Sequence, residues 1–310
     1  MANYLVTGGA GFIGSKVISE LIKLGNSVVT IDNLTTGDIA NIPLGAKFIC
    51  GNCHDLNVIN KLKSFKFDAI FHIAGQSSGE ISFEDPVYDL QTNTQSTLLL
   101  LDFALKSGCN KFIYASTMSI YGAQKNHKCD EKSIPNPISF YGVGKIASEN
   151  YMKIYQSYGI SCIALRLFNV YGPGQNLSNL KQGMISIYIA MALKNNKIQV
   201  KGSGDRYRDF VYIDDVVCAF LSCIDYQHKD FQVINISTGI KSRVNDVLMI
   251  IKQYWPQNIE VEFLNGTPGD QFGIVGNNQK AKAEFNWEPK IEIESGIKTM
   301  IDWAFNKAVK

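Results

Sequence analysis

The sequence of 310 residues lacks an excess of either charge, a long apolar run and a regular set of cysteines. Thirty Lys and Arg against twenty-eight Asp and Glu give a formal net charge of +2, so nothing indicates a nucleic-acid partner. No apolar run approaches the ~20 residues that span a bilayer, and we therefore expect no membrane association. Residues 1–14 also lack the basic start and cleavage site of a signal peptide, so the expected location is the cytoplasm.

The seven cysteines are an odd number and are scattered, which fits reduced thiols better than a disulfide framework. Cys50 and Cys53 have the spacing of a metal or redox pair, but no second Cys or His pair follows at ligand spacing. We therefore expect no bound metal. An apolar fraction of 45% and a charged fraction of 19% indicate an ordinary globular protein.

The sequence does contain an alternation of short apolar runs and amphipathic stretches. The run at residues 4–7 is followed by glycines and by a helical pattern over residues 12–24. Further runs predict strands at residues 28–31, 48–50, 69–72, 112–115 and 162–167. This alternation predicts an α/β fold, a doubly wound parallel Rossmann sheet covered on both faces, with ligands at the carboxyl ends of its strands.

The regular alternation ends near residue 171, where a smaller C-terminal lobe is expected to begin. The expected elements of this part are a helix, a strand, a helix and a strand, at residues 185–193, 198–200, 216–224 and 233–236. We expect the stretch near residues 213–240 to return to the main sheet. The predicted domains are therefore residues 1–170 and a partly interleaved substrate lobe over residues 171–310.

Three glycines, Gly8, Gly11 and Gly14, stand between the first strand and the first helix. Without side chains there, backbone N–H groups and the helix N-terminus can approach a pyrophosphate. Asp32 ends the second strand, where a carboxylate can accept both hydroxyls of a ribose and would repel a 2′-phosphate. The pattern predicts an NAD site. The alternative is that these glycines only make a tight turn and Asp32 only caps a loop, which would produce the same sequence pattern.

Tyr141 and Lys145 lie four residues apart in a helical segment, so both project from one face. A phenol with its usual pKa of ~10 is a poor base at neutral pH. A nearby ammonium and a positively charged nicotinamide would lower that pKa, so that Tyr141 can take a hydroxyl proton while hydride leaves for NAD. Ser116 and Thr117 follow a predicted strand and could donate to the reacting oxygen. Either hydroxyl could instead bond the backbone, which we favour for Ser116.

These residues and several longer motifs resemble the NAD-dependent nucleotide-sugar epimerase/dehydratase family of extended short-chain dehydrogenases. The motifs span nearly the whole chain: the glycine loop, DNLTTG at residues 32–37, HIAGQ at 72–76, STMSIYG at 116–122, YGVGK at 141–145, RLFNVYGP at 166–173 and RDFVYIDD at 208–215.

The resemblance implies a role for each matching residue. Thr117 would be the hydroxyl donor, Tyr141 the base and Lys145 its partner at the nicotinamide ribose. The implied NAD contacts are Gly8, Gly11, Phe12, Ile13, Gly14, Asp32, Asn33, Thr36, Gly37, Asn52, Cys53, Ala74, Gly75, Gln76, Asn93 and Lys145. The implied contacts of a nucleotide-sugar substrate are Ser78, Thr117, Asn169, Arg208 and Asp270, with Asn169 and Arg208 at the diphosphate. The resemblance also implies a homodimer, paired through the helices that end near residues 103 and 155.

The residues after Thr117 narrow the implied reaction. Dehydratases of the family usually carry an Asp-Glu pair there, and related decarboxylases a Glu at the second place, whereas this chain has Met118 and Ser119. Reductases of the family generally use NADP, which Asp32 disfavours. Oxidation at C4 through a 4-keto intermediate remains, as in a nucleotide-sugar 4-epimerase. A 4-dehydrogenase that releases the keto sugar would use the same residues, and the intact catalytic set argues against a non-catalytic NAD-binding regulator.

Three departures from the family leave the substrate open. Thr267 stands where an arginine usually grips the phosphates of UDP, Asn52 replaces an aspartate near the adenine, and residues 276–281 lack the usual start of the next helix. A UDP-linked sugar and a GDP-linked hexose or heptose are therefore both open.

Overall fold

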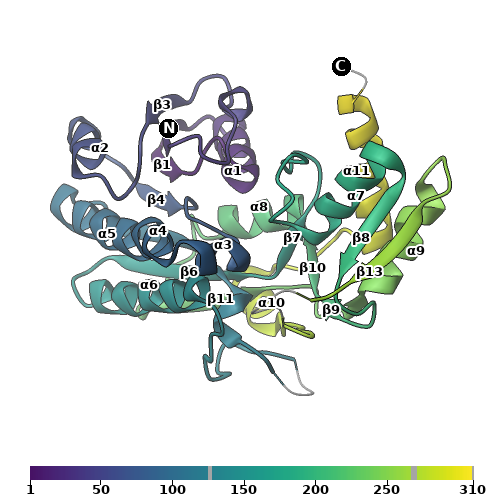
Figure 1. The fold of residues 1–310 in the computed structure, drawn as a ribbon. Helices are drawn as coiled ribbons and strands as arrows, with labels where there is room; N and C mark the ends of the chain where they lie inside the picture. Colours follow the sequence, from purple (N-terminus) through teal and green to yellow (C-terminus); the bar gives the residue numbers. More distant parts are fainter. Residues whose placement is uncertain (125–127, 267–270, 309–310) are drawn as a thin grey trace.

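The computed structural model describes residues 1–124, 128–266 and 271–308, with the elements labelled as in Figure 1. The strands are β1 (Asn3–Thr7), β2 (Ser27–Asp32), β3 (Lys47–Cys50), β4 (Ala69–His72), β5 (Lys111–Thr117), β6 (Ser161–Leu167), β7 (Asn169–Tyr171), β8 (Lys197–Lys201), β9 (Tyr207–Arg208), β10 (Phe210–Tyr212), β11 (Gln232–Ile236), β12 (Ser242–Arg243) and β13 (Glu260–Leu264). The α-helices are α1 (Phe12–Lys23), α2 (Leu56–Asn60), α3 (Gly79–Glu84), α4 (Pro86–Asp89), α5 (Ser96–Ser107), α6 (Phe140–Gln156), α7 (Met184–Asn195), α8 (Ile213–Ser222), α9 (Val244–Tyr254), α10 (Gln279–Phe285) and α11 (Ile293–Ala308). Shorter turns are η1 (Ile39–Asn41), η2 (Lys61–Ser64) and η4 (Met118–Tyr121), and η3 (Leu90–Gln95) is a π-helix.

Seven strands form the central sheet, in the order β11-β6-β5-β4-β1-β2-β3. Every neighbouring pair in it is parallel. The chain first winds outward from β1 through β2 to β3 and then crosses to β4, on the other side of β1. This reversal creates the crevice in which doubly wound proteins bind ligands, at the carboxyl ends of the strands. The predicted Rossmann architecture is confirmed.

Successive residues of one strand enter two different cores, because the pleat points them to opposite faces of the sheet. Tyr4 and Val6 pack in the core that includes α1 and α8. Leu5, between them, packs in the core that includes α2, α5 and α6. Both faces of the sheet are therefore covered by helices, which explains why its strands appear in the sequence as continuous apolar runs.

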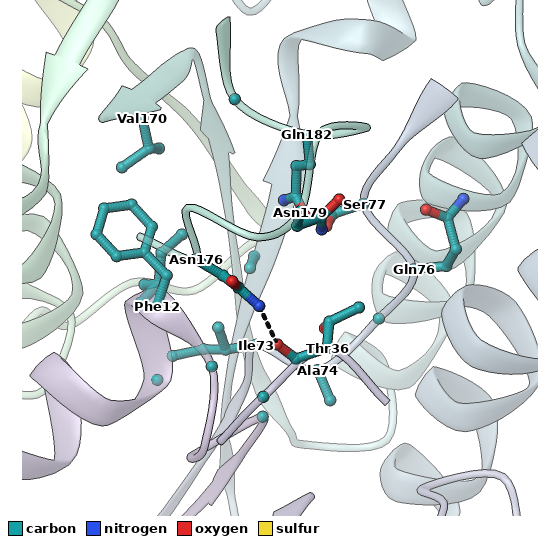
Figure 2. Close-up of a pocket in the computed structure, with 18 of the residues that line it drawn as sticks. Phe12, Thr36, Ile73, Ala74, Gln76, Ser77, Val170, Asn176, Asn179 and Gln182 are labelled. Atoms are coloured by element: carbon teal, nitrogen blue, oxygen red, sulfur yellow. Dashed lines mark hydrogen bonds between the residues drawn. The ribbon is translucent and has the colours of Figure 1, made fainter. Parts of the chain in front are cut away.

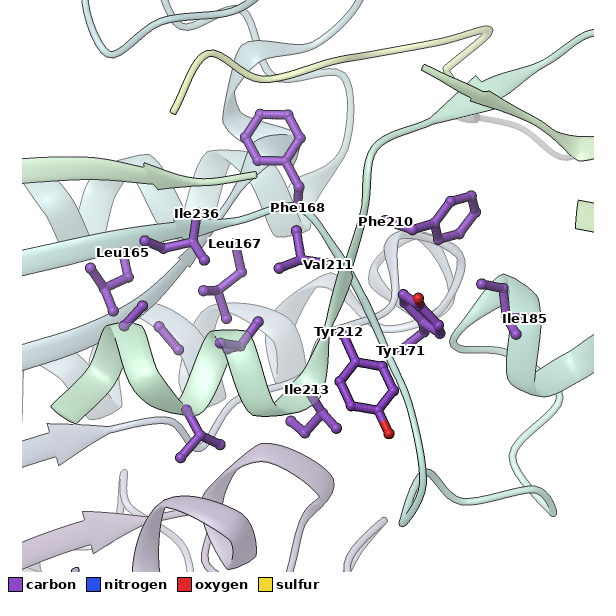
Figure 3. Packing of buried hydrophobic residues seen from close by; sticks show 14 of the residues in the cluster. Leu165, Leu167, Phe168, Tyr171, Ile185, Phe210, Val211, Tyr212, Ile213 and Ile236 are labelled. Carbon is purple, nitrogen blue, oxygen red and sulfur yellow. The ribbon is translucent and has the colours of Figure 1, made fainter. Parts of the chain in front are cut away.

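The smaller lobe is built around the parallel pair of β8 and β13. α7 packs on β8, and α11 packs on both α7 and α9 (Figure 1). β11 returns to the central sheet and pairs with β6. Figure 3 shows Leu165 and Leu167 of β6 packed with Ile236 of β11 and Ile213 of α8. The lobe and the sheet therefore share a core, while the proposed domain limit at residue 170 stays a prediction.

The predicted elements differ from the observed ones mainly at their ends. The helix expected over residues 216–224 begins earlier, at Ile213, with Asp214 and Asp215 in its first turn. Carboxylates are favourable at a helix N-terminus, so these two residues extend the helix beyond the apolar pattern. Among the helices within the described ranges, none is both long enough and apolar enough to cross a membrane.

Candidate active site

A cavity of about 970 Å³ lies at the carboxyl ends of β1, β2, β4, β5 and β6. Its wall includes the glycine loop after β1 and the catalytic candidates Thr117, Tyr141 and Lys145. Sites for single small ligands reach roughly this volume at most. The cavity therefore has room for a cofactor and a substrate side by side.

The glycine loop brings the start of α1 close to the strand behind it. Gly8 has a positive φ of 77°, and a Cβ there would lie 2.8 Å from the backbone nitrogen of Ala74. A Cβ on Gly14 would collide with the carbonyl oxygen of Gly8. α1 begins at Phe12 with Gly11 as its N-cap, so no side chain caps it and no acidic residue lies in its first turn. The loop therefore offers free backbone N–H groups and a positive helix end to an anion.

Asp32 is buried at the end of β2, on the wall of the same cavity. Its two carboxylate oxygens accept hydrogen bonds from the backbone nitrogens of Ala10, at 3.0 Å, and Leu34, at 2.8 Å. Each oxygen has a second lone pair, so the carboxylate can still accept ribose hydroxyls. Asn33 and Asn52 are joined next to it by a 2.7 Å hydrogen bond. The geometry fits the adenosine ribose of NAD.

The catalytic candidates meet at the end of β5. Lys145 donates a hydrogen bond of 2.9 Å from Nζ to the carbonyl oxygen of Ala115, and its Nζ lies 5.8 Å from the ring centre of Tyr141. Tyr141 is hydrogen-bonded to Thr117. The Thr117 hydroxyl also donates to Ser119 Oγ at 3.2 Å. A hydroxyl, a phenol and an ammonium thus lie together beside the cavity.

Burial dominates the ionisation of this group. It raises the pKa of Tyr141 to about 12, although the hydrogen bond to Thr117 lowers it. It lowers the pKa of Lys145 to about 8, against the attraction of Asp89 and Glu149. The lowered pKa expected for Tyr141 is thus not a property of the chain alone. The charge of an oxidised nicotinamide would lower it further.

Ser116 has the structural role that the sequence favoured. Its hydroxyl donates to Glu149 of α6, whose carboxylate also accepts hydrogen bonds from Nε and Nη2 of Arg166. The Ser116 hydroxyl is thereby held in a buried ion pair between α6 and β6.

Most of the predicted binding residues lie on the cavity wall, with four exceptions. Ser78 donates to the carbonyl oxygen of Lys181 and caps α3. Asn93 lies buried beneath Gln76 and donates to its carbonyl oxygen. Arg208 is buried and donates to backbone carbonyl oxygens, among them that of Tyr207.

The fourth exception, Asp270, lies outside the described residues, as does Thr267. Asn169, in contrast, lies on the wall, and its side-chain oxygen is buried without a hydrogen-bond partner in the described part of the chain.

Sequence reasoning missed the segment after β7, which lines the cavity. Asn176, Asn179 and Gln182 lie on the wall, and Figure 2 shows Asn179 and Gln182 next to Ser77. Asn176 donates to the carbonyl oxygen of Thr36 at 3.3 Å (Figure 2). The only sequence signal was the Gly- and Asn-rich composition of the stretch after residue 171.

Comparison with known proteins agrees with this geometry. A model of the NAD dependent epimerase/dehydratase family matches residues 4–237. The chain belongs to this family. Three similar proteins illustrate the match. A putative UDP-glucose 4-epimerase of Methanocaldococcus jannaschii is 35% identical over 97% of this chain and 98% of its own length.

Two of these three are solved structures. The UDP-glucose 4-epimerase of Thermotoga maritima with UDP-glucose has a TM-score of 0.95 at 35% identity, covering 99% of this chain and 100% of its own. The Thermus thermophilus UDP-glucose 4-epimerase complex with NAD has a TM-score of 0.91 at 33% identity. The match covers 98% of this chain and 99% of the Thermus chain.

Membership of the family confirms the predicted class of protein. This epimerase/dehydratase family member is an enzyme of the extended short-chain dehydrogenase type, and NAD is its cofactor. The glycine loop and Asp32 are the residues whose geometry fits that cofactor.

Proposed function

We propose that the protein is an NAD-dependent 4-epimerase of a UDP-linked hexose. The observation that carries the proposal is the meeting of Thr117, Tyr141 and Lys145 beside a cavity that also holds the glycine loop. Relatives that span nearly the same length as this chain are UDP-glucose 4-epimerases, which supports UDP as the nucleotide.

The residues of the site divide the chemistry between them. NAD, when bound, takes up the hydride from C4 and returns it. Tyr141 would accept the proton of the C4 hydroxyl, and Thr117 would donate a hydrogen bond to the same oxygen. Lys145, which reaches Ala115 with its ammonium, would stabilise the phenolate form of Tyr141. Once the hydride is back on C4 and Tyr141 has returned the proton to the oxygen, the sugar is again an alcohol and the cycle is redox-neutral.

The neighbours of Thr117 argue against elimination or decarboxylation at the keto stage. Met118 and Ser119 line the cavity directly after it, and neither carries an acid that could protonate a leaving group. Asn169 would donate from its side-chain nitrogen to the nucleotide diphosphate, or accept from a sugar hydroxyl through its buried side-chain oxygen, which has no partner among the described residues. With the diphosphate held, the keto sugar can turn and present its other face to the same cofactor.

A 4-dehydrogenase is the second candidate, because Thr267 offers no guanidinium to hold the diphosphate. Mixing the protein with catalytic NAD and excess UDP-glucose distinguishes the two, with NMR to identify the sugar and absorbance at the nicotinamide band to follow NADH. Epimerisation gives many turnovers, an inverted C4 proton and no net NADH. Stoichiometric NADH with a 4-keto product would establish the dehydrogenase instead. No turnover of UDP-, GDP-, CDP- or dTDP-sugars would contradict both.

We also propose a homodimer, paired through α5 and α6. Val143 and Ile154 of α6 are 52% and 54% exposed. They lie eleven residues apart, which is three helical turns, and so share one face of the helix. A second copy of the chain would cover these apolar side chains.

A further inference from the structure

A buried carboxylate lies behind the catalytic residues. Asp89, at the end of α4, is 1% exposed. Its Oδ1 accepts hydrogen bonds from the side-chain amides of Gln76, at 2.8 Å, and Asn93, at 3.1 Å. An ionised carboxylate is a pure acceptor, and an oxygen that receives two N–H donors is typical of that form. Such a group in a buried place needs a positive charge nearby.

The positive charge that acts on Asp89 is Lys145, whose Nζ lies next to Gly75 together with Oδ1 of Asn93, the residue bound to Asp89. Lys145 is 3% exposed, and no ion pair within 4.0 Å joins it to a carboxylate in the described ranges. Gly144, its neighbour in α6, packs its backbone against the same carboxylate, since a Cβ there would lie 3.3 Å from Asp89 Oδ2. Burial raises the pKa of Asp89 and lowers the pKa of Lys145, and the attraction between the two opposite charges acts against both shifts.

Among the other groups described around Lys145, Glu149 alone also raises its pKa. Glu149, on the same helix, is already bound to Arg166 in a 2.6 Å ion pair. His72 of β4 is neutral, because burial and Lys145 lower its pKa to about 3. Tyr114 of β5 and Tyr141 of α6 are phenols whose pKa burial raises, so both are neutral at pH 7.

Asp89 also fixes the orientation of the side-chain amides of Gln76 and Asn93, which lie near the proposed cofactor site. Because Asn93 Nδ2 donates to both Asp89 and the Gln76 carbonyl, Asn93 Oδ1 must face the other way, towards Gly75. That oxygen is buried and has no partner among the described residues. Gln76 is held in the same manner, with its amide nitrogen on Asp89 and its oxygen accepting from the backbone of Ser78.

We propose that Asp89 is a positioning residue for proton transfer at Tyr141, whose buried carboxylate keeps Lys145 in the ammonium form and turns Asn93 towards the cofactor. The inference rests on the proposed function only for its kinetic assay. Asp89 touches neither substrate nor reacting atoms. It acts through Lys145 and the two amides.

Replacing the Asp89 carboxylate by a neutral amide of the same shape should lower the pKa of both Lys145 and Tyr141. Asp89 raises the pKa of Lys145 and also that of Tyr141. In Asp89→Asn both values therefore fall, Lys145 loses its proton at lower pH, and the whole pH–rate profile moves towards acid. A variant with only structural damage would lower the plateau of the profile and leave its limbs in place.

The test compares the wild-type protein, Asp89→Asn and a matched control, Asp302→Asn, which removes an exposed carboxylate from α11, outside the proposed dimer interface. We expect a shift of the kcat profile by about one pH unit towards acid in Asp89→Asn, a drop in kcat of about tenfold at pH 9 and a KM within about twofold of wild type. Calorimetry should show weaker NAD binding, because Asn93 is released. The control should match the wild type.

NMR titration of protein labelled with 13C-lysine measures Lys145 without any turnover, with its signal assigned by Lys145→Arg. A lower pKa of Lys145 in Asp89→Asn supports the proposal even if no nucleotide sugar is converted. If Asp89→Asn does not fold, Gly144→Ala pushes on the carboxylate and keeps its charge, and we expect a smaller shift in the same direction. An unchanged pKa of Lys145 in the folded variant overturns the proposal.

Discussion

At the residue scale, three buried tyrosines around β5 differ in whether they lie inside the protein or on the wall of the cavity. Burial raises the pKa of Tyr114, Tyr121 and Tyr141 alike. Tyr121 donates to Asn235 and accepts from Arg166, inside the protein. Tyr141 lies on the wall of the cavity, beside Thr117 and Lys145. Access to the cavity, rather than acidity in the chain alone, therefore distinguishes Tyr141 as the candidate base.

Tyr141→Phe should lower turnover by ~10²-fold or more, because it removes the group that accepts the proton. NAD binding should be nearly unchanged, since the ring and Lys145 remain. Steady-state kinetics and calorimetry with NAD measure the two effects. Tyr155→Phe, on the same helix, is the matched control and should retain wild-type turnover. A folded Tyr141→Phe variant with normal turnover would remove Tyr141 from the mechanism.

At the scale of elements, α6 positions the catalytic candidates Tyr141 and Lys145 and is fastened to the sheet. Tyr141, Lys145 and Glu149 follow one another at intervals of four residues, so they share a face of the helix. Ser139 caps the start of α6 by accepting from the backbone nitrogen of Gly142 at 3.1 Å. At the other end of this face, Glu149 pairs with Arg166 of β6, and both are buried. The ion pair holds α6 against β6, the neighbour of β5, and so keeps the catalytic candidates of α6 near the end of β5.

Glu149→Leu should lower the free energy of unfolding by about 3–5 kcal/mol, because it leaves the Arg166 guanidinium buried without its carboxylate. Urea unfolding followed by circular dichroism measures the difference. Glu20→Leu removes the exposed pair with Lys23 and should cost less than ~1 kcal/mol. If the two variants lost the same free energy of unfolding, burial of the Glu149–Arg166 pair would add nothing to its contribution to stability.

At the scale of the whole molecule, the cavity is closed by contacts between parts distant in sequence. Lys181, after β7, pairs with Glu84 of α3, and Lys201 of β8 pairs with Glu80 of the same helix. Asn176 bonds to Thr36 across the cofactor side. These contacts join the smaller lobe to the sheet over the candidate site. The face of α6 that points away from the cavity carries the exposed apolar residues Val143 and Ile154.

Val143→Lys should convert the proposed homodimer into a monomer, because a charge would be buried where two apolar faces meet. Sedimentation velocity of wild type and variant measures the change in mass. Met249→Lys replaces an exposed apolar side chain on α9 and should leave the dimer intact. A monomeric wild-type protein at micromolar concentration would contradict the proposal.

The sequence by itself determined the strands of the central sheet, the glycine loop and the spacing of Tyr141 and Lys145. These features depend on backbone periodicity, which is local: a period of two in strands, four-residue spacing in helices, and glycines where backbones touch. Asp32 and Thr117 were placed at the site because each follows the end of a predicted strand, which is an equally local feature, and the family resemblance then named Thr117 as the hydroxyl donor. Each of these residues lies on the wall of the observed cavity.

Only the tertiary structure decided what surrounds these residues. It packed Asp89 of α4 against the backbone of Gly144, the neighbour of Lys145, paired Glu149 with Arg166, and bonded Asn176 to Thr36. It also showed that burial raises the pKa of Tyr141, where spacing alone had suggested the opposite. Burial and charge pairing depend on how elements far apart in the chain pack together, and no spacing within one sequence encodes that packing.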